Sequence, residues 1–362
     1  MNTASRASER GMALALAIFA LVVVGALVAG AFLAGHLEQR TGRSTLYAEQ
    51  AADAAEAGAA ETLASWDALS LNALAPGTTA AFPTVPLPGR SAYRPTVSRL
   101  NGQIFLVQSL GTRVNAGGNP IARRTVGIVA RLASLGSGPE AALTVGKPVE
   151  IEGNQVVVSG ADSADAREGM ACAPGAARPA TRIAAASSTV YAVFGDVSFD
   201  RLAAHAGVIL SDTTISSALR PLLDATGRCD VGDKSNWGEP RRSADSQMES
   251  CRRYFPIVYA RGTRLGIAGG GRGQGILLVE GDLDISGDFD FRGLVVVKGA
   301  VRISGGRTWI TGALMAANST GGNQNLLAGA TTIQYSSCAL AAALGAAAFA
   351  EPIGQRSWVQ VY

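Results

Sequence analysis

The chain has 362 residues, of which 48% are hydrophobic, 16% are charged and 44 are glycine. This composition allows a substantial core with more than one structural unit, and it excludes a disordered tail. The formal net charge of +3 is small and the basic residues are dispersed, so the sequence carries no electrostatic footprint for nucleic acid. The four cysteines and two histidines do not form a zinc-binding pattern.

The N-terminal region predicts a membrane-spanning helix. Residues 1–11 are polar and contain Arg6 and Arg10, whereas residues 12–35 contain no charge. At 1.5 Å per residue this apolar run is about 36 Å long, enough to cross a bilayer. The arginines place the start in the cytoplasm and the chain beyond the run outside it. A cleaved signal peptide is the alternative.

The helix is expected to continue past the membrane edge. Residues 36–71 contain no proline and are rich in alanine and glutamate. We predict one helix over residues 12–75, roughly 90 Å long and ended by Pro76. Apolar residues recur at helical spacing, for example at Leu37, Leu46, Ala57, Leu63 and Trp66.

The run RGMALAL, followed by an apolar helix and the stretch YAEQAADAAEAGA, resembles the N-terminal region of PilX-type pilus assembly proteins and GspK-type pseudopilins. The resemblance implies that residues 1–11 are a leader, which a prepilin peptidase removes between Gly11 and Met12 before the new amino terminus is methylated. Major pilins have Glu at the fifth mature position, where this chain has Leu16. That departure fits the PilX and GspK subgroup, some of whose members lack the Glu. The residues expected to pack in the membrane or filament are Leu14, Leu16, Phe19 and Leu21.

Residues 76–142 are predicted to form a linker and an antiparallel meander. The linker is proline-rich and extends to about residue 94. Three partly alternating runs follow, at residues 93–100, 103–112 and 122–132. Packed against the end of the long helix, they form the pilin-like core that the pattern and the resemblance lead us to expect.

Residues 143–160 contain a six-residue repeat, VEIEGN then QVVVSG, which we interpret as an early coil of a β-solenoid. Residues 161–274 would then be an inserted subdomain with helical pieces between about residues 198 and 225.

The cysteines are interpreted as disulfides, because the bulk of the chain is expected outside the cytoplasm. A bridge from Cys229 to Cys251 would stabilise the insertion by about 3 kcal/mol. Cys172 and Cys338 remain to pair with each other. The other two pairings of four cysteines stay open.

Residues 275–338 contain the clearest repeat. The block ILLVEG at Ile276 recurs as LVVVKG at Leu294, 18 residues later, and as ALMAAN at Ala313, 19 residues after that. This period predicts stacked coils of a β-solenoid, with an antiparallel meander as the alternative. The side carrying Ile276, Leu278, Leu294 and Val296 should be covered by the insertion or by residues 339–362, which are predicted to form a C-terminal helix and a closing strand.

The sequence offers no catalytic constellation and no cofactor motif, so we predict a protein that is not an enzyme. Alternate acids could supply oxygen ligands to calcium, but they lack the pattern of calcium-binding repeats. A solvated face is the preferred interpretation of these residues. The acids are Asp282, Asp284, Asp288 and Asp290.

The predicted fold class is α+β: a long transmembrane, pilin-like N-terminal helix followed by a β-rich head with an antiparallel meander and a short solenoid-like repeat. The expected function is a minor pilin or pseudopilin, at the tip or in the priming of a type IV pilus or type II secretion filament. Its partners would be other pilins and, before assembly, the bacterial inner membrane, with the pilus or cell surface as the final location. The alternative is a membrane-anchored solenoid adhesin or scaffold outside any filament.

Overall fold

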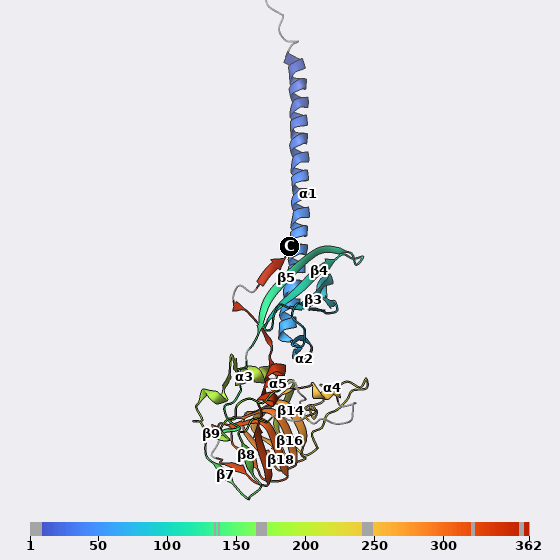
Figure 1. The fold of residues 1–362 in the computed structure, drawn as a ribbon. Coiled ribbons are helices and arrows are strands. Elements are labelled where there is room, and N and C mark those ends of the chain that lie inside the picture. Colours follow the sequence, from blue (N-terminus) through green and yellow to red (C-terminus); the bar gives the residue numbers. More distant parts are fainter. Residues whose placement is uncertain are drawn as a thin grey trace, which may run out of the picture.

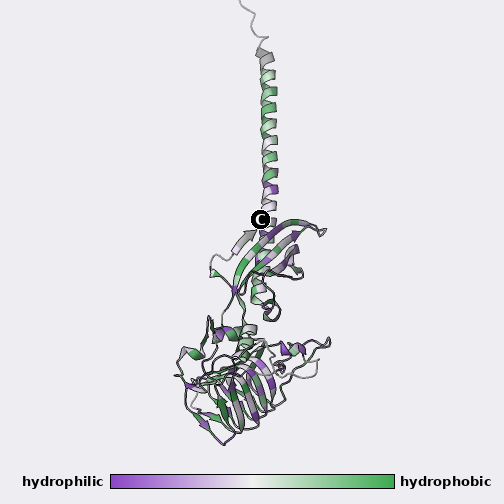
Figure 2. Cartoon of the chain, viewed as in Figure 1, coloured by the Kyte–Doolittle hydropathy of each residue, from purple (hydrophilic) through white to green (hydrophobic). Residues whose placement is uncertain are grey.

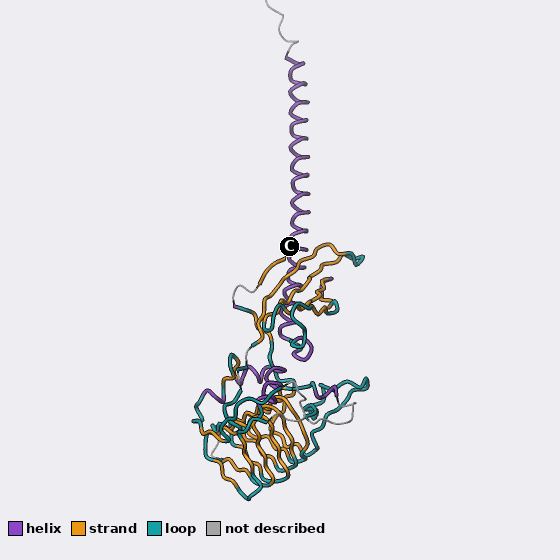
Figure 3. Tube along the Cα trace, in the orientation of Figure 1, coloured by secondary structure: helices purple, strands orange, loops and turns teal. Residues whose placement is uncertain are grey.

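The computed structural model describes residues 9–133, 135–136, 138–163, 172–240, 249–319, 323–354 and 358–361. It is an α+β protein in which a long helix, α1 (Glu9–Ala64), carries a β-rich head at its C-terminal end (Figure 1). One sheet packs on the last part of α1, and a second, larger sheet lies beyond it (Figure 3). The expected long apolar helix and β-rich head are confirmed.

The long helix ends earlier than predicted. α1 stops at Ala64, and a short helix, α2 (Ala68–Leu71), follows it. Between them the Trp66 ring packs edge-to-face on Phe105, with ring centroids 5.1 Å apart. Its indole N–H also donates a hydrogen bond to Asn72 Oδ1 at 2.9 Å. Burial of this ring stabilises the turn, so Pro76 is not the residue that ends the helix.

The face of α1 that contacts the first sheet is built from small residues. They follow the i, i+3, i+4, i+7 spacing of one helix face. Leu37 and Leu46, which support the helix by their spacing, do not belong to this face and are 54% and 49% exposed. The small side chains let the backbones approach closely: a Cβ added at Gly111 would lie 1.9 Å from the carbonyl oxygen of Ala51. The buried residues of this face are Ala51, Ala54, Ala55, Gly58 and Ala59.

The first sheet is antiparallel throughout the pairings described, and the predicted three-stranded meander is its centre. Part of the expected linker instead forms edge strands, and the C-terminal strands extend the other side. Its strands are β1 (Thr79–Ala81), β2 (Val85–Leu87), β3 (Ser91–Arg99), β4 (Ile104–Val114), β5 (Pro120–Leu132), β21 (Ala350–Pro352) and β22 (Trp358–Val361). The 3-10 turn η1 (Pro88–Arg90) joins β2 to β3.

The second sheet has thirteen strands, and the pairings between its described strands are parallel. They are β6 (Leu143–Val145), β7 (Val149–Ile151), β8 (Val157–Ser159), β9 (Thr181–Ile183), β12 (Val208–Ile215), β13 (Ile257–Ile267), β14 (Gly271–Val279), β15 (Asp282–Ile285), β16 (Phe289–Val297), β17 (Val301–Ile303), β18 (Arg307–Ala316), β19 (Asn325–Leu327) and β20 (Ala330–Tyr335). Parallel pairing rules out the antiparallel alternative for the repeat.

The register of these strands reproduces the predicted period. Gly275 of β14 pairs with Gly293 of β16, 18 residues on, and Gly293 pairs with Gly312 of β18, 19 residues on. The three glycines have φ of 105°, 131° and 133°, a region that favours glycine. They form a ladder that α5 (Ser337–Ala347) contacts, since a Cβ at Gly293 would meet Ala343 Cβ at 3.0 Å.

The outward apolar side of the repeat is covered by the rest of the chain, as predicted. Ile276, Leu278, Leu294 and Val296 are fully buried. The C-terminal helix α5 packs on β14, β16 and β18. The insertion also takes part: Phe199, at the start of α3 (Phe199–Ala204), packs edge-to-face on Tyr259, which pairs with Leu278.

The predicted early coil lies in a different place from the one expected. Its strands β6, β7 and β8 pair with β18, β19 and β20, so the segment that comes first in sequence adds to the far end of the larger sheet. β9 extends that end further. At the opposite end, β12 pairs with β13. The insertion therefore supplies strands at both ends and is not a separate small subdomain.

Short elements complete the insertion. Helix within residues 198–225 is limited to α3 among the described residues, because residues 208–215 form β12. The remaining elements are η2 (Thr189–Tyr191), β10 (Val193–Phe194), β11 (Val197–Ser198) and α4 (Glu249–Arg252).

Candidate functional site

The first half of α1 is apolar on every side and contacts no other described part of the chain (Figure 2). It is long and apolar enough to cross a membrane, judged by length and composition. Gly11 and Met12 lie in its first turns. The predicted packing residues Leu14, Leu16, Phe19 and Leu21 are 65% to 76% exposed. A helix that is hydrophobic all round requires an apolar environment, either lipid or neighbouring helices.

The second half of α1 is locked to the head by polar contacts at its margins. The Tyr93 hydroxyl donates a 2.5 Å hydrogen bond to Glu61 Oε2. This hydrogen bond, with burial, raises the pKa of Tyr93 to about 12, because ionising the phenol would place two negative charges together. Arg113 Nε donates to Gln50 Oε1 at 2.7 Å. Movement of the helix is thus transmitted to the sheet.

The link between the two sheets runs through α2 and α5. Asn72 Nδ2 donates to the carbonyl oxygens of Gly345 and Ala348 at 3.2 and 2.8 Å. After α5, β21 and β22 return to pair with β5 of the first sheet. The chain therefore enters the first sheet twice, before and after the larger sheet, which couples the larger sheet to the helix.

Two disulfides involve the insertion: one joins it to the start of α5, and the other closes a loop within it. Cys172 is bonded to Cys338 at the start of α5, with Cα atoms 5.9 Å apart. Cys229 is bonded to Cys251 and closes a loop that covers one end of the stack. That loop places Trp237 in the core, edge-to-face on Phe289. These are the pairings that the sequence analysis favours.

The double variant Cys229→Ala/Cys251→Ala is expected to unfold about 3 kcal/mol more easily, because a 22-residue separation no longer restricts the unfolded chain. Urea unfolding followed by tryptophan emission measures this, since Trp237 is fully buried. Reduction of the native protein should give a larger shift, because it also opens the Cys172–Cys338 bridge. An unchanged unfolding midpoint would show that the bridge does not stabilise the loop.

The four candidate calcium ligands are not brought together. Asp282 accepts hydrogen bonds from the Ala300 amide at 2.8 Å and from Asn323. Asp284 forms an ion pair with Arg264 at 2.5 Å. Asp288 and Asp290 lie around the next corner and line a different hollow. Among the described residues, no group of three or more potential metal ligands occurs. Asp290 is also 7% exposed, so the expectation of a fully solvated acidic face is wrong there.

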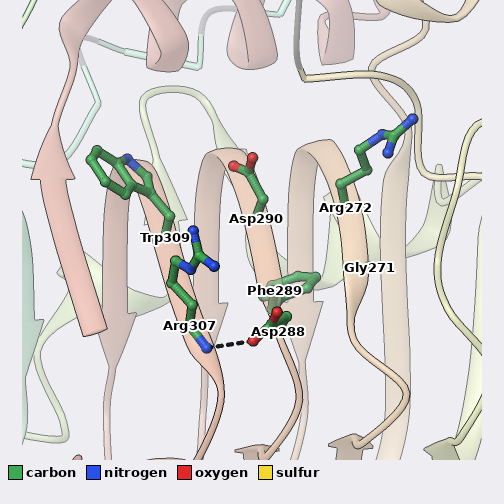
Figure 4. Close-up of a pocket in the computed structure, with 7 residues that line it drawn as sticks. All are labelled: Gly271, Arg272, Asp288, Phe289, Asp290, Arg307 and Trp309. Carbon is green, nitrogen blue, oxygen red and sulfur yellow. Dashed lines mark hydrogen bonds between the residues drawn. The ribbon is translucent and has the colours of Figure 1, made fainter. Parts of the chain in front are cut away.

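Asp288 and Asp290 instead line a groove of about 550 Å³ across β14, β16 and β18 (Figure 4). Strand register places Arg272, Asp290 and Trp309 in one row. Figure 4 shows these three side chains on the same side of the sheet, while Phe289 turns to the other side. The groove is lined by Gly271, Arg272, Asp288, Phe289, Asp290, Arg307 and Trp309.

The groove side chains are held by the surrounding structure. Arg272 forms an ion pair with the buried Glu239, with a nitrogen–oxygen distance of 2.7 Å. The Trp309 indole N–H donates to Thr311 Oγ1 at 3.1 Å, and the ring remains 41% exposed. Asp288 Oδ1 accepts the Arg307 amide at 2.7 Å. A flat aromatic ring and fixed polar groups thus share one hollow.

This groove was not predicted as a site from the sequence. The 18- and 19-residue offsets of the repeat were not applied to Trp309, which takes the position of Asp290 in the neighbouring strand. Those offsets contained the signal. The pairing of Arg272 with Glu239, from the irregular loop after Trp237, could not be found from the repeat.

Comparisons with known proteins add little. No family model and no curated protein matches the chain. Among solved structures, the crystal structure of the competence-associated pilin ComZ from Thermus thermophilus aligns over 87% of this chain and 97% of its own, with 11% identity and a TM-score of 0.22. A TM-score this low does not show a shared fold, so the likeness does not place this chain in the pilin family.

Proposed function

We propose that this chain is a minor pilin or pseudopilin-like structural subunit, anchored in the bacterial inner membrane and then assembled by its N-terminal helix among other pilins. The observation that carries the proposal is the division of α1. Its first half is apolar on all sides and exposed, whereas its second half is docked on a sheet through small residues. In the membrane the first half of α1 would be surrounded by lipid, and in the filament by apolar helices of neighbouring subunits. It would therefore stay out of water in both states.

A tip or priming position is the preferred place in a type IV pilus or type II secretion filament. No acidic residue occurs between residues 12 and 35, so the helix offers no carboxylate to the amino terminus of a neighbouring subunit. The head, with a seven-stranded and a thirteen-stranded sheet, is also bulky for a subunit repeated along a shaft. Both features suit a subunit at the end of a filament, which contacts other subunits on one side only.

We interpret the larger sheet as a short β-solenoid that serves as a display platform. Parallel pairing, the offsets of 18 and 19 residues and the glycine ladder support this interpretation. The hydrogen bonds of Asn72 to the end of α5 and the pairing of β21 and β22 with β5 would keep this platform at a fixed orientation to α1.

The variant Gly11→Phe tests the assembly role, because a prepilin peptidase requires a small residue before the cleaved bond. We expect this variant to keep residues 1–11 and to be lost from sheared filaments while it remains in the membrane. Gly30→Phe is the matched control: it also enlarges an apolar helix position with open space around it, and it should be processed and assembled.

A membrane-anchored adhesin or scaffold outside any filament is the second candidate, since it would have the same apolar anchor and the same head and would differ only at the leader. In that case Gly11→Phe should reach its location uncleaved and remain functional. Immunoblots of membrane and sheared-filament fractions separate the two outcomes.

A further inference from the structure

We propose that the groove lined by Arg272, Asp288, Asp290, Arg307 and Trp309 binds an uncharged oligosaccharide. The inference concerns the head alone and does not rest on filament assembly. Its volume of about 550 Å³ lies in the range of small-molecule sites in proteins.

The aromatic ring supplies the apolar contact. A single exposed tryptophan on a protein surface needs no explanation by itself. Trp309 differs because it lies in a hollow and because its indole N–H is fixed by Thr311. A ring held in one orientation loses little entropy when a ligand stacks on it. The C–H face of a pyranose ring matches such a flat apolar surface.

The neighbouring polar groups supply hydrogen bonds of both kinds. Carboxylates of Asp288 and Asp290 accept, and the guanidinium groups of Arg272 and Arg307 donate. Sugar hydroxyls do both, so they can match such a mixed set. The ion pair with the buried Glu239 keeps the Arg272 side chain in place before a ligand arrives. Strands about 4.8 Å apart put Trp309 and Arg272, two strands from each other, about 10 Å apart, which a short sugar chain can bridge.

The charge balance of the groove selects against polyanions. Arg272 is already paired with Glu239, so the carboxylates of Asp288, Asp290 and Glu239 outnumber the two arginines, and a nucleic-acid strand would meet repulsion at the groove. An uncharged ligand has no such conflict. The chemistry of the groove therefore favours a neutral saccharide over a phosphate-bearing chain.

The test uses the full chain in phosphatidylcholine nanodiscs, which avoid sugar-based detergents, and isothermal titration calorimetry. The probes are cellohexaose, laminarihexaose, chitohexaose and maltohexaose, with a single-stranded DNA 20-mer as the polyanion. We expect at least one hexasaccharide to bind with a Kd of about 1 mM or tighter. Trp309→Ala should weaken that binding by about tenfold or more, whereas Trp309→Phe should retain it within about threefold.

Trp358→Ala is the matched control, since Trp358 is 47% exposed on β22 of the other sheet, and it should bind like the native protein. If circular dichroism shows that Trp309→Ala is misfolded, Trp309→Leu replaces it, because leucine keeps apolar bulk and lacks the flat ring. The proposal is overturned if no hexasaccharide binds, if the non-aromatic variant binds as tightly as the native chain, or if the DNA binds and the sugars do not.

Discussion

Replacement of Gly111 by alanine is expected to lower the free energy of unfolding of the head by about 3 kcal/mol. The added methyl group would lie 1.9 Å from the Ala51 carbonyl oxygen and 2.6 Å from the Ala55 amide nitrogen. Both are backbone atoms of α1, so no side-chain rotation relieves the overlap. The helix must move away from β4, and the small-residue contact of Ala54 and Gly58 with the sheet is lost with it.

Gly102→Ala is the control for this experiment, because the same methyl group at that position, in the turn between β3 and β4, has no atom within 4 Å. Urea unfolding followed by circular dichroism compares the two variants with the native chain. A Gly111→Ala protein with native stability would mean that α1 is not closely packed on the first sheet, and the transmission of helix position to the head would then fail.

Gly293→Ala is expected to destabilise the stack by about 4 kcal/mol or more, the sum of two costs. The position has φ of 131°, which is strained for any residue with a side chain. Its methyl group would also lie 2.0 Å from the Gly275 carbonyl oxygen in the preceding coil and 3.0 Å from Ala343 of α5. The change therefore separates the paired strands β14 and β16 and displaces the covering helix α5.

Gly207→Ala serves as the matched control, with open space around the added methyl group and an ordinary φ. Thermal unfolding followed by tryptophan emission reports on the stack, because Trp237 and Trp309 lie within or on it. If Gly293→Ala unfolds at the native temperature, the coils do not stack as tightly as the register of Gly275, Gly293 and Gly312 requires.

Two parts of the fold could be predicted from the sequence, because each depends on a local pattern of residues. The uncharged run at residues 12–35 predicts an apolar helix by composition alone. The period from Ile276 to Leu294 predicts the parallel register, because coils that share a length must place equivalent residues side by side. The burial of Leu294 and Val296 was predicted from the same pattern. A strand with apolar residues on both faces needs another part of the chain packed against each face.

The parts that sequence reasoning missed depend on long-range packing. Order along the chain predicts that residues 143–160 begin the stack, yet β6 pairs with β18 at its far end. On α1, the apolar spacing predicted a helix but did not show which face is docked, and close approach of the sheet selects Ala51, Ala55 and Gly58. Hydrophobicity alone does not reveal where a backbone requires small neighbours.

The groove shows the same limit at the level of a candidate site. Asp288 and Asp290 were noted from the sequence as solvated acids or calcium ligands. Their significance changes once the register places Arg272 and Trp309 beside them and a loop closed by Cys229 and Cys251 supplies Glu239. Which residues share this hollow is decided by the offset between paired strands, which the repeat gives, and by the insertion, which the repeat does not reveal.

The measurement that tests the central proposal most directly is mass spectrometry of the N-terminal peptide from sheared filaments, with and without the prepilin peptidase. A pilin-like subunit is predicted to begin at Met12 with a methylated amino group in the filament fraction. In the strain without the peptidase it should keep residues 1–11 and stay in the membrane. A chain that keeps those residues in both strains, or that never enters the filament fraction, would contradict the proposal that α1 assembles among pilins.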